Sequence, residues 1–593
     1  MDPNIHEEDV RLHVSYLAGE ALGGRLTGTE GERLATEYAA YVFRALGLQP
    51  AGEDGSYFQP FEFLAGVSLG PDNRLALKRD DSAEETFLVD TQWRPLAFSR
   101  SGELAAPVVF AGYGIVAPAL ESLPEYDSYA HLDVKDKWVL AFRYIPEEVS
   151  TERRLHLTQY GGLRYKAIAA RDRGAVGLII VSGPNAQAAQ RVVALSFDAS
   201  FAGTSVAAIS VDDSVAASML ARSGRSLQEL QDQLDTGDPL MGFEIPGVTL
   251  RANIDIQHEK RTGRNVLARL PASEGAGDSC VVVGAHIDHL GRNAATGSLA
   301  RDEAERGRIH YGADDNASGV AGLFEIAQWF TSGEGAEAPR TRSILFAAWS
   351  GEELGLLGSA HFARTFAPNG EGLYPKVAAY VNMDMIGRMK DNVVIGGVGS
   401  SSIWHDEIRV QNTDLGLPIV TQDDSYLPTD ATSFFVKGVP FINAFTGAHE
   451  DYHTPRDTPD KLNYPATARI AQFMANVTRS LANRENAPDF IGQAKPARVE
   501  SSTGLRAYLG TIPDYAPTSE PGLVISGAAK GGPADQAGLK SGDRIVELAG
   551  KPIENIYDYT YAIESLKIGA PVTIVVIRNG ERLDMQITPI SRE

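Results

Sequence analysis

The sequence predicts an α/β protein whose main domain is a doubly wound, mostly parallel sheet, with a domain inserted into it and a smaller domain behind it. Three observations predict this organisation. The chain has 593 residues, well beyond the roughly 250–300 at which one hydrophobic core stops growing. Apolar strands alternate with helical stretches over residues 279–484, which is typical of a parallel sheet covered by helices. Residues 66–255 instead carry short apolar strands and one expected helix, at 163–173.

The main domain is predicted to be discontinuous. Its first part holds two helices with apolar residues at helical spacing, at 8–19 and 30–47, the second stopped by Gly47. Strand character resumes at 265–270 (NVLARL), beyond the middle section. We therefore predict a main domain made of residues 1–65 and 256–485, with residues 66–255 inserted into it.

Five apolar strands and four helices are expected in the second part of the main domain. The strands are CVVVGAH, RSILFAAWS, KVAAYVNMDM, NVVIGG and VPFINAF, and the helices span residues 316–330, 353–366, 402–413 and 463–484. The carboxyl ends of such strands form the binding edge of an open α/β sheet. Polar residues that follow these strands are therefore the first candidates for a functional site.

The C-terminal section is predicted to be a separate domain. Pro488 and the polar stretch 492–503 indicate a linker, which we place at residues 486–503. Residues 504–593 then combine short strands, glycine turns and two short helices.

Composition excludes several classes of protein. The formal charge of −23, from 54 Lys and Arg against 77 Asp and Glu, argues against a nucleic-acid binder, which needs a basic face to neutralise phosphates. Such acidity favours cationic ligands, such as metal ions or free amino termini. The single cysteine, Cys280, excludes an intrachain disulfide framework and a cysteine-based zinc site.

The sequence bears on the membrane and the compartment as well. No apolar run approaches the ~18 residues of a membrane span, so we expect no membrane-spanning helix. The start, MDPNIHEEDVR, is too polar for a signal peptide. Either the protein is cytoplasmic, or an export signal has been removed and replaced by a start Met.

Two histidines and three carboxylates lie in contexts that together indicate a metal site. Zinc binds imidazole nitrogen and carboxylate oxygen, and two ions ~3.5–4 Å apart can share a bridging carboxylate and water. The five residues are His286 in GAHIDHLG, Asp315 in GADDNASG, Glu353 in SGEELGLLGS, Asp384 in VNMDMIG and His453 in DYHTP. Each follows or interrupts an apolar strand or opens a helix.

Each stretch taken alone also has an ordinary structural explanation. Asp314 and Asp315 could serve as charge partners of a helix N-terminus, and His289 is expected to be structural. Two features favour chemistry. Asp384 interrupts an apolar strand, where a carboxylate needs a partner or a cation. Glu352 and Glu353 are adjacent, so their side chains point apart, and one can bind metal while the other faces water.

The order of these motifs resembles that of the co-catalytic zinc aminopeptidases, the family of bacterial leucyl aminopeptidases and, more distantly, glutamate carboxypeptidase and the transferrin receptor. The resemblance covers residues 1–65 and 256–485. It implies two zinc ions, although other divalent ions also suit such ligands. The roles it implies are as follows: His286 and Asp384 bind one zinc, Glu353 and His453 bind the other, Asp315 bridges them, Glu352 is the general base, Asp288 orients His286, and Tyr452 steadies the oxyanion.

The other two sections resemble known domains. Residues 66–255, with VVFAGYGI and KAIAARDRGAVGLIIVSG, resemble a protease-associated domain. Residues 504–593 resemble a PDZ domain of the bacterial protease kind, in which Tyr508-Leu509-Gly510-Thr511 matches the carboxylate-binding loop. PDZ domains capture peptide or protein C-termini by strand addition. The chain departs from many relatives in having Ala431 where they have a histidine, and in lacking a cysteine pair near the site.

These resemblances predict an aminopeptidase that hydrolyses peptides with a free N-terminus, using a bridging water activated by Glu352. The alternatives are a carboxypeptidase, a dipeptidase or a glutaminyl cyclase of the same superfamily, and a non-catalytic binding protein of the receptor branch. All five ligand positions are retained, which favours the two-metal hydrolase. Protease-associated and PDZ attachments are typical of exported bacterial enzymes, so we expect a periplasmic or secreted protein.

Overall fold

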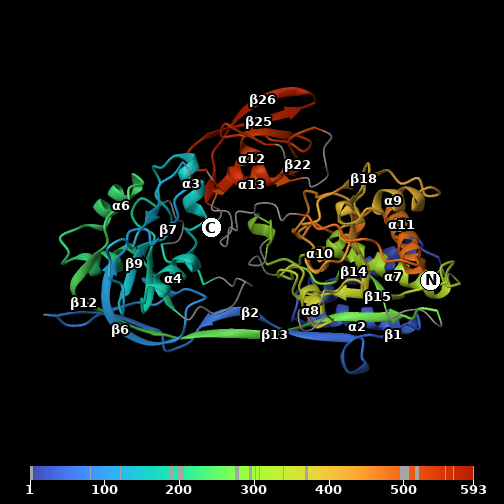
Figure 1. The fold of residues 1–593 in the computed structure, drawn as a ribbon, viewed down its shortest axis with the longest axis horizontal. Helices are drawn as coiled ribbons and strands as arrows, with labels where there is room; N and C mark the ends of the chain where they lie inside the picture. Colours follow the sequence, from blue (N-terminus) through green and yellow to red (C-terminus); the bar gives the residue numbers. More distant parts are fainter. Residues whose placement is uncertain are drawn as a thin grey trace.

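The protein has three parts that lie side by side (Figure 1). The computed structural model describes residues 4–80, 82–120, 122–186, 191–195, 206–273, 279–292, 297–300, 302–305, 307–337, 339–366, 372–493, 507–513, 520–529, 531–553, 556–564 and 566–591. The main domain is at the right of the figure and the insertion at the left. The C-terminal part sits above the space between them.

The main domain is built on a mixed sheet with a parallel centre. Four adjacent strands run parallel: β15 (Ser343–Trp349), β14 (Cys280–His286), β16 (Val377–Met383) and β19 (Phe441–Phe445). On one side of them, β13 (Ile256–Leu270) lies antiparallel to β15 and pairs with β1 (Gln49–Pro50) and β2 (Phe58–Leu69). On the other, β17 (Val393–Gly396) lies antiparallel to β19 and carries β18 (Ile419–Gln422). The predicted parallel order thus holds for the central strands, and antiparallel strands flank them.

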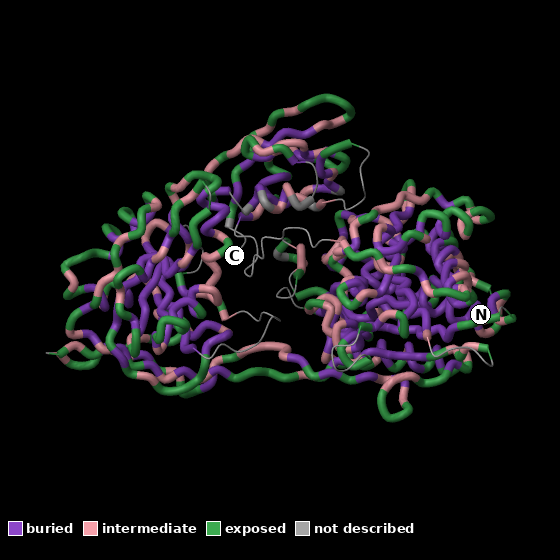
Figure 2. Tube along the Cα trace, viewed as in Figure 1, coloured by how far each residue is buried: buried purple, intermediate pink, exposed green. Residues whose placement is uncertain are grey.

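Helices cover both faces of this sheet, which explains why its central strands are apolar throughout. Successive side chains of a strand point to opposite faces, so Val281 and Val283 of β14 join one core cluster and Val282 another. The first face packs against α1 (Glu7–Leu17), α2 (Glu30–Ala45), α7 (Gly319–Ser332), α9 (Trp404–Gln411) and α11 (Tyr464–Asn483). The second packs against α8 (Leu357–Phe366) and α10 (Ala431–Phe435). Figure 2 shows the buried interior that results.

The end of α2 illustrates how the sequence sets an element boundary. The helix buries Ala35, Ala39 and Phe43 on one face. Gly47 follows with a φ of 72°, a left-handed conformation that glycine adopts at little steric cost. The backbone N–H of Leu48 then donates to the carbonyl of Phe43 at 3.1 Å, as in a Schellman motif. The predicted stop at Gly47 is therefore present.

The insertion forms its own eight-stranded sheet. Its strands, in spatial order, are β4 (Glu85–Phe87), β3 (Arg74–Arg79), β12 (Phe243–Ile254), β6 (Gly102–Phe110), β9 (Trp138–Phe142), β10 (Gly177–Val181), β11 (Ala207–Val211) and β5 (Trp93–Pro95). A separate short pair is formed by β7 (Val116–Ala117) and β8 (Tyr126–Asp127).

The expectation of a single helix in the insertion was wrong. The predicted helix is α4 (Leu163–Asp172), but α3 (Thr151–Thr158), α5 (Asp213–Leu220) and α6 (Leu227–Asp235) are also present. The start of α6 carries a readable signal, because Ser226 and Glu229 form a capping box. These three helices are eight or nine residues long, too short for a strong periodic pattern.

A two-stranded ribbon connects the insertion to the main domain. Strands β2 and β13 pair antiparallel from Phe58 opposite Val266 to Leu69 opposite Ile256. The ribbon extends between the main sheet and the insertion, with β2 leading out and β13 leading back (Figure 1). The chain therefore leaves the main domain and returns to it along neighbouring strands.

The C-terminal part has a core of its own. Its sheet has the order β21 (Thr511–Pro513), β22 (Leu523–Ala528), β23 (Arg544–Leu548), β25 (Val572–Arg578) and β26 (Glu581–Ile587), with β24 (Lys551–Pro552) on β23. A second pair consists of β20 (Ala507–Tyr508) and β27 (Ile590–Ser591). The two predicted helices are α12 (Pro533–Gln536) and α13 (Ile556–Glu564). Of the predicted linker, residues 494–503 lie outside the described residues.

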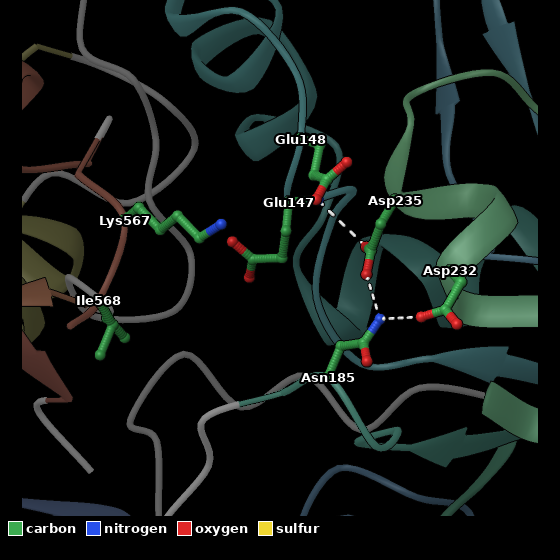
Figure 3. A pocket seen from close by; sticks show the side chains of 7 residues that line it. All are labelled: Glu147, Glu148, Asn185, Asp232, Asp235, Lys567 and Ile568. Carbon is green, nitrogen blue, oxygen red and sulfur yellow. Dashed lines mark hydrogen bonds between the residues drawn. The ribbon is translucent and has the colours of Figure 1, made fainter. Parts of the chain in front are cut away.

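The C-terminal part also meets the insertion. A pocket between them is lined by Glu147, Glu148, Asn185, Asp232 and Asp235 from the insertion and by Lys567 and Ile568 from the C-terminal part (Figure 3). The Lys567 side chain points towards Glu147 in this view. The C-terminal part and the insertion therefore adjoin each other at this pocket.

Candidate metal centre

The residues predicted to bind metal gather at the carboxyl edge of the parallel strands. His286 is the last residue of β14, and Glu352 and Glu353 follow β15 after a short turn. Asp384 was expected within its strand, but it lies one residue beyond the end of β16. Its N–H still donates to the carbonyl of Ala444 at 3.1 Å. The strand thus delivers the carboxylate to the edge of the sheet, where it avoids the apolar core.

The first group of side chains consists of His286, Asp315 and Asp384. The Nε2 atom of His286 lies 3.3 Å from Oδ1 of Asp315 and 3.3 Å from Oδ1 of Asp384. One ligand atom from each residue falls within 4.8 Å of the others, and all three residues are largely buried. Such a spacing lets the three groups bind one ion from three sides.

The second group shares Asp315 with the first. The Nε2 atom of His453 lies 3.2 Å from Oδ2 of Asp315 and 3.1 Å from Oε2 of Glu353. His289, which was expected to be structural, also lies here: its Nδ1 atom is 2.6 Å from Oε1 of Glu353 and 3.8 Å from Oδ2 of Asp315. Two imidazoles therefore face Glu353.

Asp315 lies between the two groups, with one oxygen towards each. The irregular turn Ala313–Ser318 ahead of α7 presents this side chain. Asp457, which sequence analysis missed, holds the turn: its Oδ2 atom accepts the backbone N–H groups of Asp314 at 2.9 Å and of Asp315 at 3.1 Å. Its position in a polar loop after His453 gave no signal of this role.

Asp288 is fully buried beneath the centre. Its Oδ1 atom accepts the backbone N–H of Glu352 at 3.2 Å, and its Oδ2 atom accepts the Thr27 hydroxyl at 3.1 Å. The Nδ1 atom of His286 lies 3.3 Å from the backbone carbonyl of Asp288 and 3.8 Å from its Oδ1 atom. The nearer contact of the imidazole is thus with the backbone of Asp288.

Arg25, from the glycine-rich turn between the first two helices, supports the same region. Its buried guanidinium donates to the carbonyls of Ile287 at 2.9 Å, Gly312 at 2.9 Å and Tyr311 at 2.8 Å. It also reaches Leu17 at the end of α1. Arg25 thereby joins the segment after His286 to the segment before Asp315.

The electrostatics of the two groups favour a cation between them. Burial alone would lower the pKa of His286, but Glu352, Asp384 and Asp315 raise it well above its ordinary value. Burial would raise the pKa of Glu353, but His453 and His289 lower it to about 2. Within the described residues, no well-aligned hydrogen bond reaches the buried Oδ2 atom of Asp315, although Nε2 of His453 lies 3.2 Å away. Buried charges need a partner, and this donor set of imidazoles and carboxylates fits zinc.

Two other carboxyl groups near the centre, those of Glu352 and Asp430, have raised pKa values. Desolvation and the nearby Asp384 and Asp430 raise the pKa of the half-buried Glu352 well above its ordinary value. Burial and the carboxylates Asp288 and Asp384 raise the pKa of Asp430 to about 7. From the sequence, the neighbouring Ala431 was noted only as a departure from relatives. Asp430 was not identified as a residue near the centre.

Tyr452 lies beside the second group. Its ring stacks on that of His453, with ring centroids 3.8 Å apart and planes at 22°. Both side chains line a cavity of about 1030 Å³, which is also lined by Tyr508, Leu509, Gly510 and Thr511 of the C-terminal part. The predicted carboxylate-binding loop is therefore on the same cavity as the candidate metal centre.

Comparison with known proteins agrees with these motifs. Residues 265–478 match the model of peptidase family M28, and residues 497–588 match that of the PDZ domain. An aminopeptidase of Pseudomonas aeruginosa is 26% identical over 274 residues, which is 40% of this chain and 45% of that protein. Aminopeptidase YwaD of Bacillus subtilis is 25% identical over 200 residues, 32% of this chain and 42% of that protein. The chain spans about half the length of the curated relatives it matches.

Among solved structures, that of an aminopeptidase from Aneurinibacillus sp. strain AM-1 is similar to this chain. The comparison gives a TM-score of 0.48 and 18% sequence identity, and it covers 83% of this chain and 97% of that one. The family matches cover both the metal-site motifs and the C-terminal sheet. The chain is therefore similar to peptidase family M28 over residues 265–478 and to PDZ domains over residues 497–588.

Proposed function

We propose that the protein is a two-zinc aminopeptidase that removes N-terminal residues from peptides. The observation that carries this proposal is the position of Asp315, whose Oδ1 atom lies 3.3 Å from Nε2 of His286 and whose Oδ2 atom lies 3.2 Å from Nε2 of His453. A carboxylate with an imidazole at each oxygen is suited to bridge two ions. The aminopeptidases among its relatives support the choice of reaction.

The proposed ligands divide between two ions that share Asp315. His286 and Asp384 hold one, and Glu353 and His453 hold the other. Zinc ions at these positions would lower the pKa of a shared water and polarise the scissile carbonyl. Other divalent ions would suit the same oxygen and nitrogen ligands.

The chain's own residues move the proton and hold the geometry. Glu352 is the general base: it takes a proton from the attacking water and passes it to the leaving amine. The raised pKa of Glu352 suits a group that must hold that proton between the two steps. Asp288 accepts the backbone N–H of Glu352 and so fixes the position of that residue. Asp288 also limits the rotation of His286. Tyr452, stacked on His453, is assigned to the developing oxyanion.

We also propose the domain division that the sequence predicts. Residues 1–65 and 256–485 form the peptidase domain, 66–255 the insertion, 486–503 a linker and 504–593 the PDZ domain. The separate insertion sheet, reached through the β2–β13 ribbon, supports this division. We assign the insertion to the protease-associated type on its sequence resemblance.

We also propose that the protein works in the periplasm or outside the cell. Protease-associated and PDZ attachments on such a peptidase support this location. Among the described residues, no helix is both long and apolar enough to cross a lipid bilayer.

The test combines metal content with substrate choice. Purified protein should contain two equivalents of zinc or another divalent ion and hydrolyse aminoacyl anilides, and chelation should abolish the activity. Peptides with a blocked N-terminus should not be cleaved, which separates an aminopeptidase from a carboxypeptidase. Undiminished activity after complete metal removal would contradict the proposal.

A further inference from the structure

The cavity beside the candidate metal centre has two walls from different domains. On the peptidase side it is lined by Tyr452 and His453, and His453 is within 3.2 Å of Asp315 and Glu353. On the other side it is lined by the PDZ loop from Tyr508 to Thr511 and by α13. Its volume of about 1030 Å³ is slightly above the ~300–1,000 Å³ typical of ligand pockets. A single ligand can therefore touch both domains.

The PDZ loop turns two amide N–H groups away from its own core. The carbonyl of Leu509 accepts from Ala534 N and the carbonyl of Gly510 accepts from Ala529 N, each at 2.7 Å. In a trans peptide unit the N–H points opposite to the carbonyl, so the N–H groups of Gly510 and Thr511 point away from these donors. Gly510 holds the loop with a φ of 77°. Successive N–H groups of this kind form an anion-binding nest.

The groove beyond this loop has the form that accepts an extended peptide. Within the described part of the PDZ domain, β21 pairs only with β22, so one edge of β21 is open. The opposite side is α13, whose Tyr559 hydroxyl contacts the Thr511 hydroxyl at 2.5 Å and whose Ile563 also lines the cavity. An added strand would hydrogen-bond to β21 and place side chains against α13.

The charges of the two walls are complementary to the two ends of a peptide. The peptidase wall holds four acidic and two basic residues: Asp302, Glu305, Glu450, Asp451, Arg456 and Lys461. Arg456 pairs with Glu305 and Lys461 with Asp451, and Asp302 and Glu450 are the acidic residues of this wall outside these two pairs. Among the described residues that line it, the PDZ wall carries no charged side chain. A peptide ammonium is thus favoured at the peptidase wall and a carboxylate at the N–H groups of the loop.

We propose that the PDZ groove is a distal subsite of the peptidase, which binds the C-terminal carboxylate of the same peptide whose N-terminus lies at the metal centre. This inference rests on the proposed aminopeptidase function and adds a substrate class to it. The substrates are short peptides with a free carboxyl end, able to lie within one cavity. The PDZ domain then selects peptides by length and by their unblocked C-terminus.

The test uses the metal-loaded, full-length protein with paired substrates. Each peptide of a length series is supplied with a free or an amidated C-terminus, and an aminoacyl anilide serves as a substrate too small to reach the groove. We expect kcat/KM to be higher for the free acid by about tenfold, equivalent to one charge-assisted interaction, at the lengths that fit. The advantage should disappear for longer peptides.

A matched pair of variants locates the effect. Thr511→Asp places a negative charge in the loop, and Thr511→Asn has nearly the same size without the charge. We expect Thr511→Asp to remove the advantage of the free acid and Thr511→Asn to retain most of it, with the acid-to-amide ratio of kcat/KM compared within each variant. Because this ratio is taken within one variant, a general loss of activity leaves it unaffected.

The outcomes separate the two proposals. No hydrolysis of the anilide or of any peptide by the metal-loaded protein would overturn the aminopeptidase function itself. Hydrolysis of the anilide, with equal kcat/KM for acid and amide at every length in the unmodified protein, would overturn only the distal subsite. Binding of an N-acetylated peptide acid that leaves peptide hydrolysis uninhibited would do the same, because it would assign the groove to a separate partner.

Discussion

The Oδ1 atom of Asp288 accepts the backbone N–H of Glu352 at 3.2 Å. This bond joins the segment after β14 to the segment after β15, so one buried carboxylate fixes both the histidine motif and the proposed base. Asparagine at position 288 could accept only one of the two bonds that Asp288 now accepts. We expect Asp288→Asn to lower kcat by about 10–100-fold, as typical for a residue behind metal ligands, with zinc content retained. An unchanged kcat would show that the link is dispensable.

Glu352 is predicted to serve as the general base and not as a metal ligand. Glu352→Gln should lower kcat by about 10²–10⁴-fold, the usual contribution of a general base, while zinc content stays at the level of the unmodified protein. Glu450→Gln is the matched control, because it makes the same change at a carboxylate that lines the neighbouring cavity and is not a proposed metal ligand. Loss of zinc in Glu352→Gln would instead identify Glu352 as a ligand.

The two imidazoles near Glu353 can be separated by substitution. His453 Nε2 is close to both Asp315 and Glu353, at 3.2 and 3.1 Å, whereas His289 Nδ1 is 3.8 Å from Asp315. We therefore expect His453→Ala to lose one equivalent of metal and His289→Ala to retain both, as measured by atomic absorption. The reverse result would assign the second ion to His289.

Glu32 should make stability fall as pH rises. Its buried carboxyl accepts the Arg264 N–H and the Ser350 hydroxyl, each at 3.0 Å, and burial raises its pKa from 4.5 to about 7. Below pH 4.5 both the folded and the unfolded states are protonated. As pH rises to 7 the unfolded state ionises first, so the free energy of unfolding falls, by up to about 3 kcal/mol.

The variant Glu32→Gln removes this dependence and keeps a carbonyl oxygen as acceptor. Its stability relative to the unmodified protein should increase between pH about 4 and about 8, as followed by urea denaturation. A difference in unfolding free energy that is constant over this range would show that Glu32 does not titrate as stated. The control is Glu30→Gln at an exposed position. Its unfolding free energy relative to the unmodified protein should vary little over this pH range.

Most strands and helices of the main domain, and the candidate metal ligands, could be predicted from the sequence. Strands such as Cys280–His286 were predictable because they are buried on both faces and hence apolar throughout. His286, Asp315, Glu353 and Asp384 were identifiable because each lies at or shortly after the end of a strand or at the start of a helix, and His453 because it lies in a polar turn after an apolar strand. The short helices of the insertion lacked the length that makes a periodic pattern visible.

The residues that support the centre were harder to predict. Asp457 and Arg25 act through the backbone of other segments: Arg25 contacts Ile287 and Gly312, far away in the chain. Such contacts depend on the tertiary fold and leave no local pattern. The place of His289 beside Glu353 depends in the same way on how two strand ends meet.

The paired strands β2 and β13 have a consequence for how such proteins can evolve. Because Phe58 lies opposite Val266 and Leu69 opposite Ile256, the two ends of the intervening segment are adjacent at every point along the ribbon. A tight turn could join the two strands into a hairpin at either end of the ribbon. An ancestor could therefore gain, shorten or exchange this segment without rerouting the host chain.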